Sequence, residues 1–123
     1  MNYITNFLTL QNQMRVFHWQ TQKNPGSFAQ HEAFGTAYDE LDPLIDDFIE
    51  IYQGKKGKLM ANGTFNIALH NLDENPEAFI DEFVEYLVNI VPQRLDDADT
   101  DLLNIRDEML AILNQTKYRL HMM

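Results

Sequence analysis

Apolar side chains recur at intervals of three and four residues through most of the chain, which is the spacing of an amphipathic α-helix. Glycine and proline gather mostly between these periodic segments, as they do in loops that join helices. Few segments alternate apolar and polar residues in the manner of a β-strand. The pattern therefore predicts an all-α protein built as a four-helix bundle, with one long connection between the second and third helices.

The first predicted helix runs from Asn2 to about Gln22. Its apolar stripe includes two polar members and is expected to face a partner helix. The stripe consists of Ile4, Phe7, Gln11, Met14 and His18. Residues 23–26, Lys-Asn-Pro-Gly, break this helix. Ser27 and Gln30 have the spacing of a capping box, so the second helix is expected to begin near Phe28.

The second predicted helix has a seam in which spacings of three and four strictly alternate, as they do in helical bundles. The members of this seam are His31, Phe34, Tyr38, Leu41, Ile45, Phe48 and Tyr52. Gly54 is the expected end of the helix. Pro43 lies inside it and deprives the Asp39 carbonyl of its usual partner, so a kink is expected there.

A long connection from Gly54 to about Glu74 follows, and residues 65–70 within it could form a short helix of their own. Asn75 as N-cap and Pro76 as first residue open the third helix. Pro92 is expected to close this helix or to kink it. The expected inward positions are Phe79, Ile80, Phe83, Leu87, Ile90 and Val91.

Thr100 is the expected cap of the fourth helix. The expected apolar positions of this helix are Leu102, Leu103, Ile105, Met109, Ile112 and Leu113. Four acidic residues near its start fit a solvated capping cluster better than the alternative, a cation entry pore in an oligomer. These acids are Asp96, Asp97, Asp99 and Asp101. Lys55, Lys56 and Lys58 are expected to lie in a solvated loop.

The composition narrows the possible partners of this chain. Its 123 residues are expected to form a single domain spanning residues 1–123. Nineteen acidic and nine basic residues give a net charge of -10, which repels phosphate backbones and anionic lipids. Direct nucleic-acid binding and a membrane partner are therefore not expected. The chain has no cysteine and shows neither an export signal nor a membrane-spanning run, so a cytoplasmic location is expected.

Four residues place imidazole or carboxylate groups on or beside the apolar helix faces. They are His18, His31, Asp46 and Glu50. A mixed set of nitrogen and oxygen donors suits iron, manganese or zinc, whereas magnesium and calcium favour oxygen alone. Taken singly, such a histidine is more often a packing residue, and such an Asp-x-x-x-Glu pair is more often a solvated face. Together they favour a metal site, whereas His70 and His121 lack acidic neighbours in helical register and receive no role.

The spacing of these residues predicts a site shared between two chains. Fifteen residues along one helix, at about 1.5 Å each, put Asp46 about 22 Å from His31. His18 and His31 flank the loop between the first two helices and are expected to meet at one end of this antiparallel pair. A two-fold dimer with antiparallel second helices brings both histidines to Asp46 and Glu50 of the partner. Two identical shared sites follow.

The same residues carry a family resemblance. The segment F-H-W-Q-T at residues 17–21, His31 within S-F-A-Q-H-E, and the spacing of Asp46 and Glu50 resemble the signature of Dps proteins. These form the DNA-protection branch of the ferritin-like superfamily. The segment D-T-D-L-L at residues 99–103 and the later Lys117-Tyr118 are similar to the final helix of that branch. Ordinary ferritins use Glu-x-x-His pairs instead, and this chain contains none.

The resemblance implies a ferritin-like four-helix bundle that binds two ferrous ions at a site shared across a two-fold interface. It further implies oxidation of this iron by peroxide or oxygen and storage of ferric mineral in a dodecameric shell. By position, the implied nitrogen ligands are His18 and His31. The implied carboxylates are Asp46, which bridges, and Glu50. Trp19 is the implied aromatic neighbour of the reacting metal.

One departure from the Dps pattern lies one turn after the second histidine. Dps proteins usually place another acid there, whereas this chain has Gly35, and Asp39 or Asp42 is the candidate replacement. The basic N-terminal tail by which some members bind DNA is also not present in this sequence. The alternative to a ferroxidase is a helical assembly or interaction protein that keeps the bundle without its metal chemistry.

Overall fold

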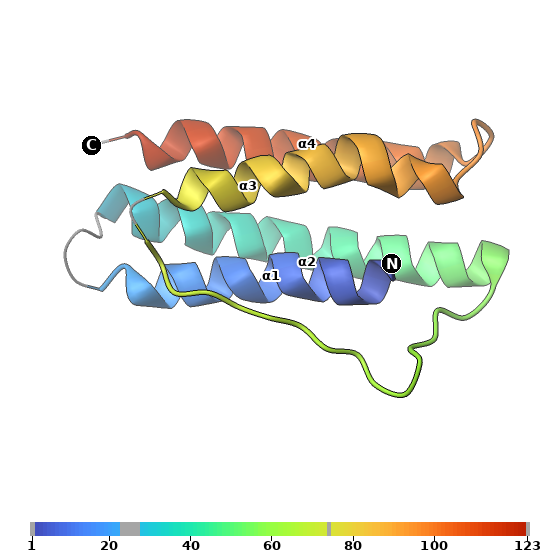
Figure 1. Cartoon of the computed structure of the whole chain (residues 1–123). Coiled ribbons are helices and arrows are strands. Elements are labelled where there is room, and N and C mark those ends of the chain that lie inside the picture. Colours follow the sequence, from blue (N-terminus) through green and yellow to red (C-terminus); the bar gives the residue numbers. More distant parts are fainter. Residues whose placement is uncertain (1, 23–27, 74, 123) are drawn as a thin grey trace.

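The computed structural model describes residues 2–22, 28–73 and 75–122, which form four α-helices and no β-strand (Figure 1). The helices are α1 (Tyr3–Gln20), α2 (Phe28–Lys56), α3 (Pro76–Glu85) and α4 (Thr100–Leu120). The predicted all-α class is confirmed. The predicted break at residues 23–26 and the cap residue Ser27 lie outside the described residues. Within the described ranges, no helix combines the length and the apolar character needed to cross a bilayer.

The long connection between α2 and α3 determines how the helices run. α1 and α2 are antiparallel, and the connection then returns along the bundle, so that α3 runs parallel to α2 and α4 runs back beside α3 (Figure 1). α2 packs against both α1 and α4 and is therefore the central helix of the core. Its buried residues are Ala33, Phe34, Ala37, Leu41, Ile45 and Phe48.

The buried face of α1 is rotated from the predicted stripe. Ile4, Gln11 and His18 are only half-buried. The buried positions are Tyr3, Phe7, Leu10, Gln13, Met14 and Phe17. The reason is that α1 has a second neighbour besides α2. Phe17 of α1 packs edge-on against Phe79 of α3, with ring centroids 5.8 Å apart. A helix between two neighbours buries a wider arc than a single seam predicts.

α2 is longer than the sequence predicted. It continues through Gly54 to Lys56, and Gly57 adopts a φ of 99°, a left-handed conformation that ends helices. The prediction that Gly54 ends the helix is therefore wrong, because the glycine that ends it is Gly57, three residues later. The helix also continues through Pro43, which lies on its exposed side together with Asp39, so water can reach the carbonyl that the proline leaves without a donor.

The connection lies against α1 without forming a helix at residues 65–70, so the suggested short helix is not found. Two glutamine side chains of α1 bind its backbone instead. Gln13 is fully buried, and its amide donates to the His70 carbonyl at 2.8 Å and accepts from the His70 N–H at 2.7 Å. Gln20 accepts from the Leu72 N–H at 2.6 Å. These bonds satisfy backbone groups that a helix would have paired internally.

The end of α3 responds to Pro92, as predicted, by changing its winding. A π turn (Tyr86–Ile90) and a 3₁₀ turn (Val91–Arg94) follow α3, because proline lacks the N–H that an α-helix requires. Arg106 of α4 donates to the freed Leu87 carbonyl at 3.0 Å, and the Tyr3 hydroxyl donates to the Val91 carbonyl. The altered winding leaves Ile90 40% exposed, so its predicted inward position is wrong.

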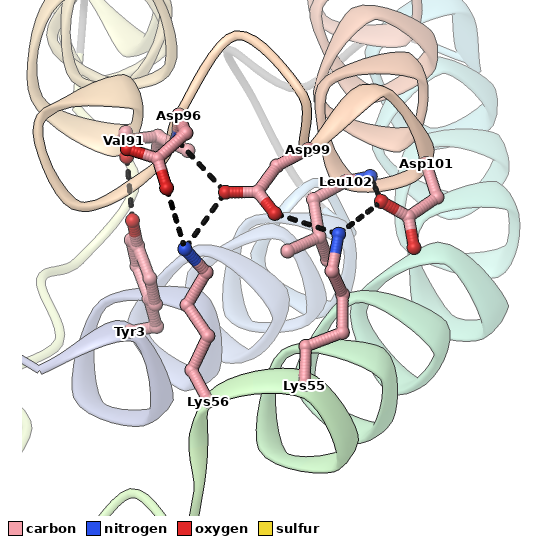
Figure 2. Close-up of polar contacts among 8 residues, drawn as sticks. All are labelled: Tyr3, Lys55, Lys56, Val91, Asp96, Asp99, Asp101 and Leu102. Carbon is pink, nitrogen blue, oxygen red and sulfur yellow. Dashed lines mark hydrogen bonds and ion pairs between the residues drawn. The ribbon is translucent and has the colours of Figure 1, made fainter.

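An ion-pair cluster joins the C-terminal end of α2 to the start of α4. We define this cluster as Lys55, Lys56, Asp96, Asp99 and Asp101 (Figure 2). The buried Asp99 carboxylate lies 2.6 Å from Lys55 Nζ and 2.8 Å from Lys56 Nζ. The predicted lysine loop is wrong for Lys55 and Lys56, which belong to α2. The predicted solvated position is wrong for the buried Asp99, whereas Asp96, Asp97 and Asp101 are exposed as predicted. Asp99 also occupies the N-cap position expected for Thr100.

Candidate functional site

The loop between α1 and α2 brings His18 and His31 together. His18 lies in the last turn of α1 and His31 in the first turn of α2. Their rings are stacked, with centroids 4.0 Å apart and planes 27° from parallel. This is the meeting expected from their positions on either side of the loop. Both residues are half-buried.

Hydrogen bonds fix the orientation of both rings. His18 Nδ1 lies 2.9 Å from the His31 carbonyl oxygen, which ties the ring of α1 to the backbone of α2. His31 Nδ1 lies 2.9 Å from Thr21 Oγ1, and this hydroxyl donates to the His18 carbonyl at 2.7 Å. Thr21 is buried and follows the last residue of α1. The two histidines and Thr21 therefore form one closed network.

Gly35 provides the surface on which the His18 ring lies. A Cβ atom at this position would be 2.8 Å from His18 Cε1 and 2.9 Å from His18 Nδ1, closer than real Cβ contacts allow. An acid at position 35 would therefore collide with the His18 ring in its present position. The absence of an acid at position 35 therefore has a steric explanation, because a glycine leaves room for the His18 ring to stack on His31.

Aromatic and cationic side chains border the imidazole pair. Tyr38, two turns along α2 from His31, packs edge-on against His18 with ring centroids 5.7 Å apart. The Arg15 guanidinium lies over the Tyr38 ring, 5.2 Å from its centroid. Trp19 is 64% exposed next to His18, which leaves its large apolar surface on the outside of this chain.

The two predicted carboxylates lie farther along the exposed side of α2. Asp46 and Glu50 are both exposed and are one helical turn apart. They border a groove of about 210 Å³ between α1 and α2, whose apolar wall includes Ile4, Leu8 and Ile49. Because α2 is a continuous helix, Asp46 remains about 22 Å along its axis from His31.

The structure therefore keeps the imidazole pair, His18 and His31, apart from the carboxylate pair, Asp46 and Glu50. Within the described part of one chain, no group of three or more histidine, aspartate and glutamate side chains converges in a way that could hold a metal ion. Of the two suggested replacement acids, Asp42 accepts a hydrogen bond from Gln11, and Asp39 is exposed. A complete mixed-ligand site would need donors from outside this chain.

Sequence reasoning missed two residues of the imidazole network. The sequence interpretation used Thr21 only as the last residue of the segment F-H-W-Q-T and gave it no role. A hydroxyl three residues after His18 at a helix end is nevertheless well placed to bind the His18 carbonyl. Gly35 was interpreted only as the position at which Dps proteins usually have an acidic residue. The available signal was its position one turn after His31, where a small residue makes room for a ring from the facing helix.

Comparison with known proteins gives one finding. Residues 18–120 match the model of a family described as "Family of unknown function (DUF5856)". No curated protein and no solved structure matches the chain. The matched range begins at His18 and includes the imidazole pair, both carboxylates and all of α2 and α4.

Proposed function

Since the chain belongs to the family of unknown function DUF5856, whose description assigns no chemistry, we propose its activity from the site itself. The proposed activity is oxidation of ferrous to ferric ion, at two sites shared across the two-fold interface of a homodimer. His18 and His31 of one chain supply nitrogen ligands, and Asp46 and Glu50 of its partner supply carboxylates. The process served is iron storage or oxidative protection, in the cytoplasm.

The observation that carries this proposal is the stacked, hydrogen-bonded imidazole pair. Its ring planes are held by a carbonyl and a hydroxyl at Nδ1, which is how metal-binding histidines are usually oriented by neighbouring groups. Imidazole nitrogen combined with carboxylate oxygen suits iron, and the carboxylates favour the ferric product. Two ferrous ions release two electrons, which with two protons reduce one peroxide molecule to two water molecules.

A two-fold dimer is the arrangement that would complete the site. With α2 antiparallel to its copy, the midpoint between His31 and Asp46 falls at Tyr38 and Asp39, which would lie at the symmetry axis. On α2, Asp46 lies about 60° and Glu50 about 100° around the helix axis from His31, so all three residues are on one half of the helix, as such packing requires. The helix order, with parallel α2 and α3 joined by a long connection, supports a ferritin-like bundle. A larger shell, such as the dodecamer of Dps proteins, is a further step of the same proposal.

The activity is tested by ferrous oxidation, measured by the absorbance of the ferric product. We expect wild-type protein to oxidise ferrous ion faster than a protein-free control, and His31→Ala or Asp46→Ala to lose the gain. Asp47→Ala is the matched control, because Asp47 is an exposed neighbour on another side of α2. Unchanged rates in both site variants would exclude this site.

Sharing between chains is tested by mixing the two inactive variants. A heterodimer of His31→Ala and Asp46→Ala has one intact site, whereas each homodimer has none. Random reassociation makes about half of all dimers heterodimers, so about one quarter of sites should recover. Heterodimers confirmed by mass spectrometry without recovered activity would mean that the ligands are not shared.

The dimer itself has a test that needs no iron. The chain has no cysteine, so a single Asp39→Cys substitution at the proposed axis should form a disulfide-linked dimer on mild oxidation. Glu40→Cys is the matched control, because the next residue is rotated by about 100° around α2 and is also exposed. Equal cross-linking of the two variants would contradict this packing. A helical assembly protein without metal chemistry would form the dimer and fail the iron assay.

A further inference from the structure

The hydrogen bond at His18 has only one possible direction. A carbonyl oxygen can accept a hydrogen bond but cannot donate one. The 2.9 Å contact between His18 Nδ1 and the His31 carbonyl therefore requires the proton to be on Nδ1. In the neutral ring the proton is then absent from Nε2, which carries a free lone pair.

The hydrogen bonds of Thr21 determine the proton position on His31 by the same reasoning. The threonine hydroxyl has a single proton, and it donates this proton to the His18 carbonyl at 2.7 Å. Toward His31 Nδ1, at 2.9 Å, the hydroxyl oxygen can only accept. His31 Nδ1 must therefore carry the proton, and its Nε2 also has a free lone pair when the ring is neutral.

We propose that Thr21 is a positioning residue that holds His31 in the Nδ1–H form, so that each ring of the stacked pair presents one Nε2 lone pair for binding divalent transition-metal ions. The use made of these ions rests on the proposed function. Among the described residues neither Nε2 atom has a hydrogen-bond partner, and neither histidine is fully buried. The apoprotein holds its two nitrogen donors ready before the partner's carboxylates contribute.

The network explains why the hydroxyl matters in addition to the histidines. If Thr21 were replaced by valine, the side-chain shape would be kept and the acceptor for His31 Nδ1–H would be lost. Nothing in the described structure would then hold the proton on Nδ1, and His31 could place it on Nε2, where it blocks metal binding. Serine at this position keeps the hydroxyl and should keep the proton on Nδ1.

The first measurement is the proton position in the metal-free protein. Long-range ¹⁵N–¹H correlation spectra distinguish Nδ1–H from Nε2–H, recorded well above the ordinary histidine pKa of about 6.5. We expect Nδ1–H for His18 and His31 in wild-type and Thr21→Ser, and loss of the His31 signature in Thr21→Val. Thr116→Val is the matched control, because the buried Thr116 hydroxyl also donates to a backbone carbonyl, that of Ile112, but does so on α4.

The second measurement is the affinity for Zn²⁺ added alone, by competition with a chromophoric chelator. Zn²⁺ binds imidazole nitrogen and does not change its oxidation state. We expect Thr21→Val to bind about 10–100-fold more weakly than wild-type, while Thr21→Ser and Thr116→Val stay close to wild-type.

Three results would overturn the proposal. They are a wild-type His31 with its proton on Nε2, a Thr21→Val protein that keeps Nδ1–H, and a changed proton position with unchanged Zn²⁺ affinity. The spectra are recorded on the apoprotein, so they do not depend on iron oxidation. If oxidation fails while the proton positions and Zn²⁺ affinities follow expectation, the proposed function falls and the positioning role of Thr21 stands.

Discussion

The two ends of the bundle use polar side chains in different ways. At the end where α2 finishes, the ion-pair cluster pairs lysine and aspartate within the chain (Figure 2). At the end where α2 begins, His18 and His31 each use Nδ1 for an internal bond and leave Nε2 without a partner in the described residues. The first arrangement satisfies its charges and fastens two helices. The second leaves two nitrogen lone pairs that the fold itself does not use.

The ion-pair cluster changes the acidity of its members. The pKa of Asp99 lies well below its usual range, because the Asp96 N–H and then the two lysine ammonium groups stabilise the carboxylate. The pKa of Lys55 is raised by Asp101 and Asp99, and that of Lys56 mainly by Asp99. Groups that are stabilised in their charged forms serve the fold, which distinguishes this end from a metal site that needs free lone pairs.

The imidazole end is most sensitive to a single added methyl group. Gly35→Ala places its Cβ within 2.8 Å of the His18 ring, so we expect a loss of about 1–3 kcal/mol in unfolding free energy, measured by urea denaturation. Gly54→Ala is the matched control in the same helix, where nothing lies within 4 Å of the added Cβ. It should stabilise the protein by about 0.5–1 kcal/mol. Equal effects of the two substitutions would contradict the seating of His18 on Gly35.

The ion-pair end should depend on Asp99 and on acid. Because the folded pKa of Asp99 is lowered, its contribution to stability is complete above its ordinary pKa of about 3.9 and is lost as the pH falls below that value. Asp99→Asn should lower the urea midpoint at pH 7 and reduce the loss of stability in acid. Asp97→Asn, which changes an exposed neighbour, is the control. Identical acid profiles for wild-type and Asp99→Asn would show that the cluster does not stabilise the fold.

Added salt should change the stability of the ion-pair end but not that of the imidazole end, and this is the smallest of the expected effects. At about 1 M salt the Debye length falls to about 3 Å, which screens the exposed lysine contacts more than the buried carboxylate. We expect the difference in urea midpoint between wild-type and Asp99→Asn to shrink slightly with added sodium chloride. The difference between wild-type and Gly35→Ala should not change, because it arises from steric overlap. A salt-sensitive Gly35→Ala effect would count against this distinction.

Sequence alone determined the helical class and most helix positions. Periodic apolar residues, the Asn75-Pro76 start of α3 and the effect of Pro92 depend on local backbone chemistry, which a sequence displays directly. The helix ends were less accurate. Gly54 and Gly57 are both plausible ends by composition. The longer helix places Lys55 and Lys56 where they form ion pairs with Asp99, the N-cap residue of α4.

Only the tertiary structure decided which polar residues work together. Spacing indicated that His18 and His31 meet, because both flank one loop, and that Asp46 lies far from them on a rigid helix. It did not identify Thr21 or Gly35, since their roles depend on the rotation of α1 against α2. Nor did it indicate that Gln13 binds the distant His70 backbone or that Lys56 binds Asp99. Such contacts depend on side-chain directions between helices, which periodicity along one helix does not record.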